Sequence, residues 1–91
     1  MENNFLNNKF DIEKTREAVR LELVKYFNRI IVAKPQQNLF YIVQEAIEKP
    51  LIEETLIYCK GSQVRASKVL GVHRNTIKKK IDQYKIKPFL R

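Results

Sequence analysis

The part of the chain that most restricts the possible fold runs from Gly61 to Tyr84 and reads GSQVRASKVLGVHRNTIKKKIDQY. Gly71 lies within it, and glycine readily adopts the left-handed backbone conformation in which many helices end. Ser62 can cap a helix before this glycine, because its hydroxyl can accept a hydrogen bond from a free backbone amide. Apolar residues recur at helical spacing on both sides of Gly71. The stretch therefore predicts two short helices joined by a tight turn.

Each predicted short helix has one apolar face, which we expect to be buried. The inward positions are Ala66, Val69 and Leu70 in the first helix and Ile77, Ile81 and Tyr84 in the second. The remaining sides of the second helix are polar and basic. They carry His73 and Arg74 at the amino end, followed by Asn75, Thr76, Lys78, Lys79 and Lys80.

This basic helix suits the major groove of DNA. The amino end of a helix has free N–H groups and positive potential, which favour phosphate. A short helix that buries one edge and exposes arginine, asparagine, threonine and lysines can enter the groove. We expect the lysines to contact phosphates, and Arg74 and Asn75 to contribute a modest base preference.

The distribution of charge along the chain agrees with a DNA-binding role for its last part. The formal net charge is +8. Residues 1–60 hold nine Lys/Arg and nine Asp/Glu, whereas residues 61–91 hold nine Lys/Arg and a single acid, Asp82. A neutral half followed by a basic half predicts one part for folding and assembly and another for a polyanion.

Other classes of function find little support in the composition. Cys59 and His73 are the only cysteine and histidine, so we expect no disulfide framework and no metal site, and we expect Cys59 to be a buried small apolar residue in a reducing cytosol. No apolar stretch is long enough to span a membrane, and no signal peptide begins the chain. No nucleophile–base set or phosphate-binding glycine loop indicates an enzyme. We expect a cytoplasmic, non-enzymatic protein without cofactor or small-molecule ligand.

The amino-terminal region predicts a tail and one long helix. Residues 1–10 are rich in asparagine and read as a flexible tail. A helix begins at Asp11 or Thr15, either of which can cap it, and runs to about Ile31. Its apolar stripe is broken only by Arg16 and consists of Ile12, Val19, Leu23, Tyr26, Phe27 and Ile30.

A second long helix is expected between Asn38, as its cap, and Lys60, with Gly61 ending it. Pro50 lies inside it and removes one backbone hydrogen bond. We predict a kinked helix whose halves face different neighbours; the alternative is two helices broken at Lys49. The apolar face is Leu39, Ile42, Val43, Ala46 and Ile47 before the proline, and Leu51, Ile52, Thr55, Leu56 and Cys59 after it.

The predicted fold is all-α, with four helices in each subunit. The stripe of the first helix and the first half of the second have little in one chain to cover them, so two copies would form an intertwined helical core. The alternative is a monomer whose stripes are covered by a larger partner. We divide the chain into the tail (1–10), the dimerisation helices (11–60) and a helix–turn–helix region that binds DNA (61–91).

From about Thr15 to Tyr84 the chain resembles the bacterial Fis family, the factor for inversion stimulation. The resemblance is carried by AVRLELVKYF, by NLFYIVQEAIEKPL around the proline, and by KGSQVRASKVLGVHRNTIKKKIDQY. It implies a homodimer that binds and bends duplex DNA, regulates transcription and organises the bacterial nucleoid. The last segment is also similar to the DNA-binding domain of sigma-54-dependent activators, which leaves a stand-alone regulator of that kind as an alternative. An RNA-binding protein and an adaptor dimer are further alternatives.

The resemblance also implies roles for residues of the basic helix. Arg74 matches the arginine that reads a guanine near the edge of the binding site. Thr76, Lys79 and Lys80 match contacts to the backbone and groove, and Lys78 stands where the family can have arginine. These assignments agree with the positions expected from the helical face.

Several positions depart from the family. His73 replaces an asparagine and Asn75 a glycine of the best-known members, which bears on the preference for the edge base. Ser62 and Gln63 align with polar contacts of the preceding helix, whereas Val64 stands where a threonine touches phosphate, so we expect that contact to be lost. Members that stimulate recombinases have an amino-terminal β-hairpin arm. About fourteen residues without a hairpin signal precede the first helix here, so we expect little or no stimulation of DNA invertases.

Overall fold

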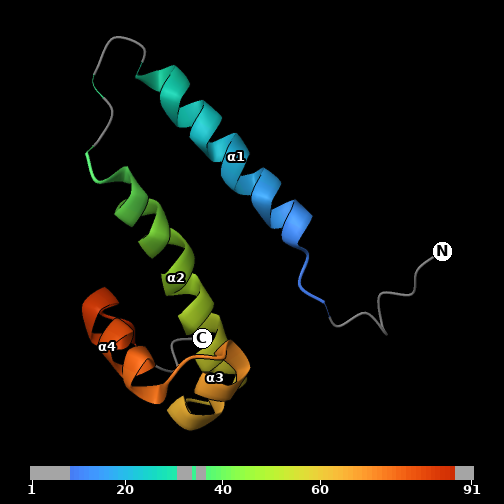
Figure 1. The fold of residues 1–91 in the computed structure, drawn as a ribbon, viewed down its shortest axis with the longest axis vertical. Coiled ribbons are helices and arrows are strands. Elements are labelled where there is room, and N and C mark those ends of the chain that lie inside the picture. Colours follow the sequence, from blue (N-terminus) through green and yellow to red (C-terminus); the bar gives the residue numbers. More distant parts are fainter. Residues whose placement is uncertain (1–8, 31–33, 35–36, 88–91) are drawn as a thin grey trace, which may run out of the picture. The chain divides into compact units, whose positions relative to one another are not determined.

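The computed structural model describes residues 9–30, 34 and 37–87, which form helices and connecting turns but no strands (Figure 1). Residues 1–8 of the predicted tail lie outside this part. The helices are α1 (Ile12–Arg29), α2 (Leu39–Tyr58), α3 (Gln63–Leu70) and α4 (Arg74–Tyr84). This confirms the all-α, four-helix prediction. The chain divides into two units, residues 1–37 with α1 and residues 38–91 with the other three helices, and each is described by itself.

Helix α1 begins at the first of the two predicted caps. The Oδ1 atom of Asp11 accepts a hydrogen bond from the backbone N–H of Lys14 at 2.9 Å. Thr15 lies inside the helix, and its hydroxyl donates to the Asp11 carbonyl oxygen. The helix ends at Arg29, two residues before the predicted end.

The apolar stripe of α1 is uncovered within its own unit. None of the residues of this helix is buried. Ile12 and Phe27 are exposed, whereas Val19, Leu23, Tyr26 and Ile30 are half-buried. A stripe of this size on one helix requires another apolar surface to cover it.

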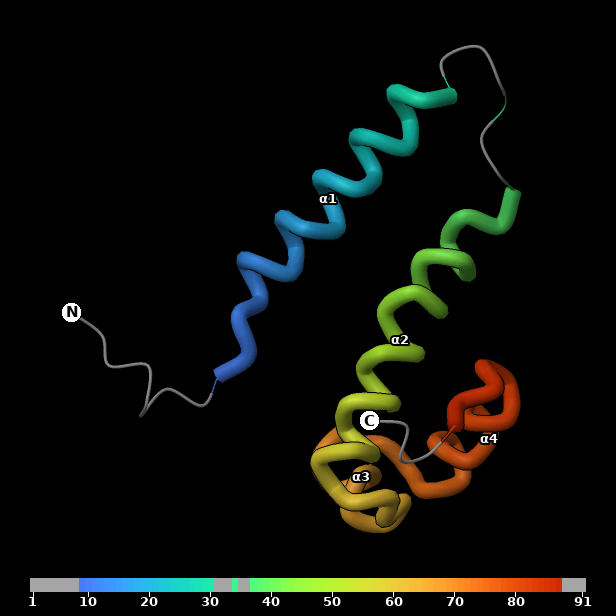
Figure 2. The backbone as a smooth tube through the Cα atoms, turned by 180° about the vertical axis from the view of Figure 1, so that it is seen from behind, coloured from blue at the N-terminus to red at the C-terminus, as the bar shows by residue number. Residues whose placement is uncertain are grey.

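Helix α2 continues from Leu39 to Tyr58 with Pro50 inside it, so the alternative of two helices broken at Lys49 is wrong. Figure 2 shows it as one uninterrupted coil. The predicted side-chain cap is also wrong: Asn38 precedes the helix but makes no side-chain cap hydrogen bond. Its φ of 63° is left-handed, whereas a capping side chain reaches the first-turn amides from an extended backbone.

The carboxyl end of α2 lies two residues earlier than predicted. The helix ends at Tyr58, and Lys60 and Gly61 both have positive φ, 54° and 85°. The N–H of Gly61 donates to the carbonyl oxygen of Leu56 at 2.8 Å. This reversal brings α3 back against the end of α2, where the two helices are in contact.

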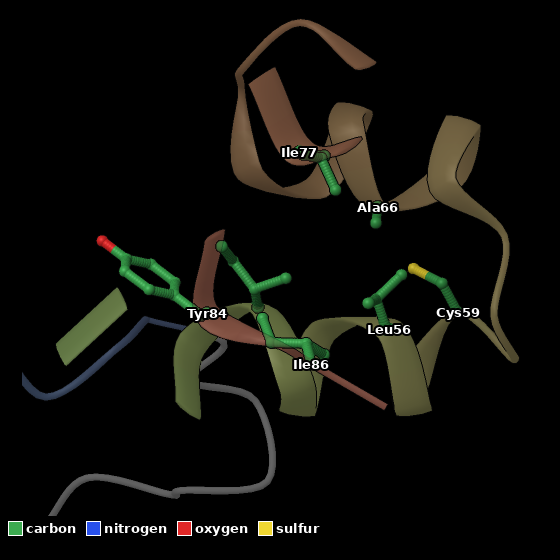
Figure 3. Packing of buried hydrophobic residues seen from close by; sticks show 7 residues of the cluster. Leu56, Cys59, Ala66, Ile77, Tyr84 and Ile86 are labelled. Carbon is green, nitrogen blue, oxygen red and sulfur yellow. The ribbon is translucent and has the colours of Figure 1, made fainter. Parts of the chain in front are cut away.

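The second half of α2 forms the core of its unit with α3 and α4, as predicted. Figure 3 shows Ala66 and Ile77 directed toward Leu56 and Cys59. The buried apolar residues are Ile52, Leu56, Cys59, Ala66, Ile77, Tyr84 and Ile86. Thr55 is buried as well, and its hydroxyl donates to the Leu51 carbonyl oxygen at 2.7 Å. Burying a large aliphatic side chain contributes about 1.5–3 kcal/mol, so these contacts hold the three helices together.

Two residues predicted to be inside are exposed. Leu51 is 49 % and Val69 is 58 % exposed. Leu51 lies about 90° from the centre of the buried face of α2, which leaves it at the edge. In α3 the buried face is centred between Ala66 and Leu70, and Val69 lies to one side. Narrow contacts between short helices therefore cover fewer positions than the periodicity alone predicts.

Ile86 is a core residue that the sequence prediction did not include. Lys85 adopts the left-handed conformation with φ 52°, and the N–H of Ile86 donates to the carbonyl oxygen of Ile81 at 3.0 Å. This is the pattern of a Schellman turn, which commonly folds an apolar residue back against its helix. Ile86 is consequently only 5 % exposed.

Candidate nucleic-acid interface

The position of α4 follows from two local signals that were predicted. The Ser62 hydroxyl accepts a hydrogen bond from the backbone N–H of Arg65 at 3.2 Å and caps α3. Gly71 ends α3 with φ 72°, and its N–H donates to the Ser67 carbonyl oxygen. Space for a Cβ atom exists at Gly71, so the need for glycine comes from the backbone conformation.

The inner face of α4 agrees with the prediction. Ile77 is 1 % and Tyr84 6 % exposed, and Ile81 packs partly buried against the same cluster. These residues hold α4 against α2 and α3, with which it is in contact. The side chains at intervening positions consequently face away from the core.

The outer face of α4 presents most of the predicted contact residues together. Arg74, Asn75, Thr76, Lys78 and Lys79 are all exposed. Within the described part of the chain, none of their side chains takes part in a hydrogen bond or an ion pair. Their donors and positive charges are therefore available to a partner such as phosphate or a base edge.

His73 has a structural role that sequence reasoning missed. Its Nδ1 atom accepts a hydrogen bond from the backbone N–H of Asn75 at 3.0 Å, which caps α4. The sequence prediction placed His73 inside the helix, at its amino end, whereas α4 begins at Arg74 and His73 occupies the cap position before it. Because Nδ1 is used in the cap, Nε2 is the ring atom that remains for an outside contact.

The other predicted residues have less freedom. Ser62 is half-buried with its hydroxyl in the α3 cap, and Gln63 is half-buried at the start of the same helix. Arg65 and Lys68 of α3 are exposed cations that the prediction left out. They sit on the helix next to α4 in a segment already recognised as basic, which was the signal for including them.

Lys80 contacts other residues of the same chain. Its Nζ atom lies 2.8 Å from Oε1 of Glu48 in α2 and 5.5 Å from the ring centroid of Tyr84. Glu48 and Lys80 are far apart in the sequence, so no helical spacing could have paired them. Lys80 therefore differs from its neighbours Lys78 and Lys79, whose side chains are exposed and have no hydrogen bond or ion pair among the described residues.

The electrostatics of this pair follow from its hydrogen bonds. The pKa of Glu48 is lowered from 4.5 to about 2, chiefly by the hydrogen bond from Lys80 and then by those from Tyr84 and Gln44. The same carboxylate raises the pKa of Lys80 and that of Tyr84. Near neutral pH the pair is therefore fully charged.

Among the described residues, no three or more His, Cys, Asp or Glu side chains lie close enough to hold a metal ion. In the same part of the chain, none of the helices has the length and apolar character required to span a lipid bilayer.

Comparison with known proteins identifies the family. Residues 43–84 match the family model described as "Bacterial regulatory protein, Fis family". The chain is 30 % identical over 69 residues to the DNA-binding protein Fis of Buchnera aphidicola subsp. Schizaphis graminum, covering 76 % of this chain and 70 % of that protein.

Two further relatives agree. A putative Fis-like DNA-binding protein of Pseudomonas aeruginosa is 35 % identical over 69 residues, which is 76 % of this chain and 65 % of the relative. One of Xylella fastidiosa is 35 % identical over 63 residues, covering 69 % and 70 % of the two chains. The region matched by the family model spans α2 from Val43 onward, α3, the Gly71 turn and α4, and the chain therefore belongs to the Fis family of bacterial regulatory proteins.

Proposed function

We propose that this protein is a homodimer that binds and bends duplex DNA and regulates transcription in the bacterial cytoplasm, as part of the nucleoid. Two α4 helices would enter adjacent major grooves at degenerate sites. The observation that carries the proposal is the outer face of α4, where five polar or basic residues are exposed and unpaired among the described residues. The names of the relatives, which describe DNA-binding proteins, support it.

The proposed contacts divide into two kinds. Lys78, Lys79 and the capped amino end of α4 would bind phosphates, which gives affinity without sequence preference. Arg74 and Asn75, in the first turn of α4, would reach base edges, and arginine can bind guanine through two hydrogen bonds. Thr76 would assist at the backbone, with support from Ser62, Gln63 and His73.

The uncovered apolar surface supports a dimer. No residue of α1 is buried, and the first half of α2 exposes Phe40, Tyr41, Ile42 and Ile47. Apolar stripes of this extent on two helices are costly in water and match the pattern of a helical dimer core. A two-fold dimer would present two copies of α4 to inverted half-sites.

Bending is proposed because a small protein with two recognition helices gains contacts when the duplex curves toward it. Smooth bending of a short site costs about 1–6 kcal/mol, which additional phosphate contacts can offset. Sites with flexible or A/T-rich centres should therefore bind more tightly even where no side chain touches them.

The experiment that tests this proposal is a gel-shift series on circularly permuted DNA fragments, combined with sedimentation of the free protein. We expect a mass near twice the 10.9 kDa of one chain and a mobility that depends on the position of the site. A monomeric mass, uniform mobility, or preference for single-stranded RNA over duplex DNA at physiological salt would each contradict a named part of the proposal.

The base-reading role is tested by Arg74→Ala. We expect a loss of about 1–3 kcal/mol in binding and a weaker sequence preference at one position of each half-site. Lys79→Ala is the control, because a phosphate contact should lower affinity on all sequences alike. If Arg74→Ala behaves in the same way as that control, Arg74 contacts phosphate and reads no base.

A further inference from the structure

Three side chains meet on the carboxylate of Glu48. Its Oε1 atom accepts a hydrogen bond from the Tyr84 hydroxyl at 2.7 Å and lies 2.8 Å from Nζ of Lys80. Its Oε2 atom accepts a hydrogen bond from Nε2 of Gln44 at 2.9 Å. Gln44 and Glu48 belong to α2, whereas Lys80 and Tyr84 belong to α4. We call these residues the Glu48 clasp.

The clasp differs in kind from the ion pairs on α1. Arg16–Glu13 and Arg20–Glu17 each join neighbouring turns of one helix, with side chains 55–83 % exposed. In the clasp, the side chains of Lys80 and Glu48 are 26 % and 27 % exposed and join two helices. A pair shielded from water is weakened less by salt and competes better against outside partners.

We propose that Glu48 is a positioning residue for DNA binding: by holding Lys80 and Tyr84 it fixes the orientation of α4 on α2, and Lys80 contacts Glu48 in place of a phosphate. This inference rests on the proposed function, because it concerns the same helix. It assigns different tasks to the three consecutive lysines of α4. Lys78 and Lys79 face outward, whereas Lys80 faces α2.

The apolar contacts of α4 do not by themselves fix the orientation of the helix. Its inner face offers Ile77, Ile81 and Tyr84, and hydrophobic burial has no preferred direction. Hydrogen bonds to a charged group are short and directional, so the clasp resists rotation and sliding of the helix. The ammonium group over the Tyr84 ring adds a cation–π contact to the same site.

The clasp lies some distance from the amino end of α4. A change in the clasp should therefore affect base recognition there more than it affects phosphate binding. Arg74 precedes Lys80 by six residues, or about 9 Å along the helix axis. A small tilt at the clasp therefore displaces the Arg74 guanidinium, whose paired hydrogen bonds to a base require accurate placement. Contacts between lysines and phosphates tolerate such a displacement better, because an ammonium group acts as a point charge.

The first test compares Lys80→Gln with Lys79→Gln by the salt dependence of binding to a duplex of scrambled sequence. The two variants remove the same charge from neighbouring positions. Each lysine that leaves a phosphate makes the slope of log K against log salt shallower by about 0.9. We expect this change in each subunit for Lys79→Gln and none for Lys80→Gln. An equally shallow slope for Lys80→Gln would overturn the inference.

The second test measures discrimination, as the ratio of affinities for a duplex selected by the wild-type protein from a random pool and for its scrambled counterpart. Glu48→Gln and Lys80→Gln should each lower this ratio about three- to tenfold, and the double variant should lower it no further. Lys80→Arg, which keeps the ion pair, should restore most of it. Losses that simply multiply in the double variant would contradict the clasp.

Tyr84→Phe keeps the inference testable if the charge variants fail to fold. It retains the buried ring and removes only the hydroxyl, so discrimination should fall by less while the salt slope stays unchanged; unaltered discrimination would count against the clasp. The two proposals fail separately. If wild-type protein does not bind DNA, both are wrong; if it binds and Lys80→Gln matches Lys79→Gln, only the present inference is wrong.

Discussion

Helices α1 and α4 are both amphipathic, yet their apolar residues have different surroundings. Helix α4 is the shorter, with 11 residues, and buries Ile77 and Tyr84 against other helices of its own unit. Helix α1 has 18 residues and buries none. The contrast shows that helical periodicity identifies an apolar face but says nothing about which surface covers it. In the proposed dimer, the covered face would stabilise each chain and the uncovered face would form the contact between the two chains.

The largest effect is expected from a substitution that creates a cavity in the covered face of α4. Ile77→Ala removes a side chain that is 1 % exposed, and we expect it to destabilise residues 38–91 by about 2–5 kcal/mol. Urea unfolding followed by circular dichroism measures the change. The control is Leu21→Ala on α1, whose side chain is 56 % exposed and whose loss should alter stability by about 0.5 kcal/mol or less. Equal effects of the two variants would remove the distinction.

A substitution on the uncovered face of α1 should weaken self-association of the protein. Phe27→Ala shortens a residue of the α1 stripe and should weaken self-association about ten- to a hundredfold, which corresponds to about 1.4–2.7 kcal/mol. Sedimentation over a range of protein concentrations measures it. Val24→Ala is the matched control, because Val24 is 50 % exposed, similar to the 46 % of Phe27, and lies outside the stripe. A larger effect at Val24 would place the interface on the other side of α1.

The Glu48 clasp makes the stability of the covered unit depend on acidity. The folded-state pKa of Glu48 is about 2, below its ordinary 4.5, so its stabilisation is present above pH 4.5 and is lost as the pH falls from 4.5 toward 2. We expect this loss to be about 1–2 kcal/mol, allowing for solvent screening at a partly exposed site. Glu48→Gln should remove that pH dependence.

The measurement for the clasp is urea unfolding at several pH values in this window. Glu45→Gln provides the control, because Glu45 is an exposed glutamate of the same helix, one turn earlier. It should leave the wild-type pH profile in place. A profile that Glu48→Gln leaves unchanged would show that the clasp does not contribute to stability.

The smallest effect is expected at the turn after α4. Lys85 has φ 52°, a conformation that costs residues with a Cβ atom about 1–2 kcal/mol and costs glycine far less. Lys85→Gly should therefore raise the free energy of unfolding by roughly 0.5–1 kcal/mol. Lys87→Gly removes the same charge from a position without positive φ and should bring no gain. Thermal unfolding distinguishes them.

Local signals were enough to predict the helices and much of the candidate interface. The Asp11 and Ser62 caps, the Gly71 turn and the inward positions Ile77 and Tyr84 all depend on residues a few positions apart. Such signals act through short-range hydrogen bonds and helical periodicity, so they can be read along the chain. The exposed face of α4 followed directly, since it is what remains once the inner face is known.

The sequence predictions were wrong where the backbone conformation differed from the one that the residue type favours, or where a contact between short helices covered fewer positions than expected. Asparagine is a preferred capping residue, but Asn38 adopts a left-handed backbone conformation and its side chain makes no cap hydrogen bond. Leu51 and Val69 have the right spacing for burial but lie at the edges of contacts between short helices. His73 became a cap although histidine is not among the preferred capping residues.

By itself, the sequence determined that four helices form, where a glycine turn separates the last two, and that the basic charge gathers after residue 60. Only the tertiary structure decided which lysine of three is engaged by Glu48, that Ile86 returns to the core, and that Leu51 and Val69 are left exposed. The physical reason is range. Caps, turns and helical periodicity act over a few residues, whereas the partner of a charge or an apolar face is chosen by packing between segments that are distant in the chain.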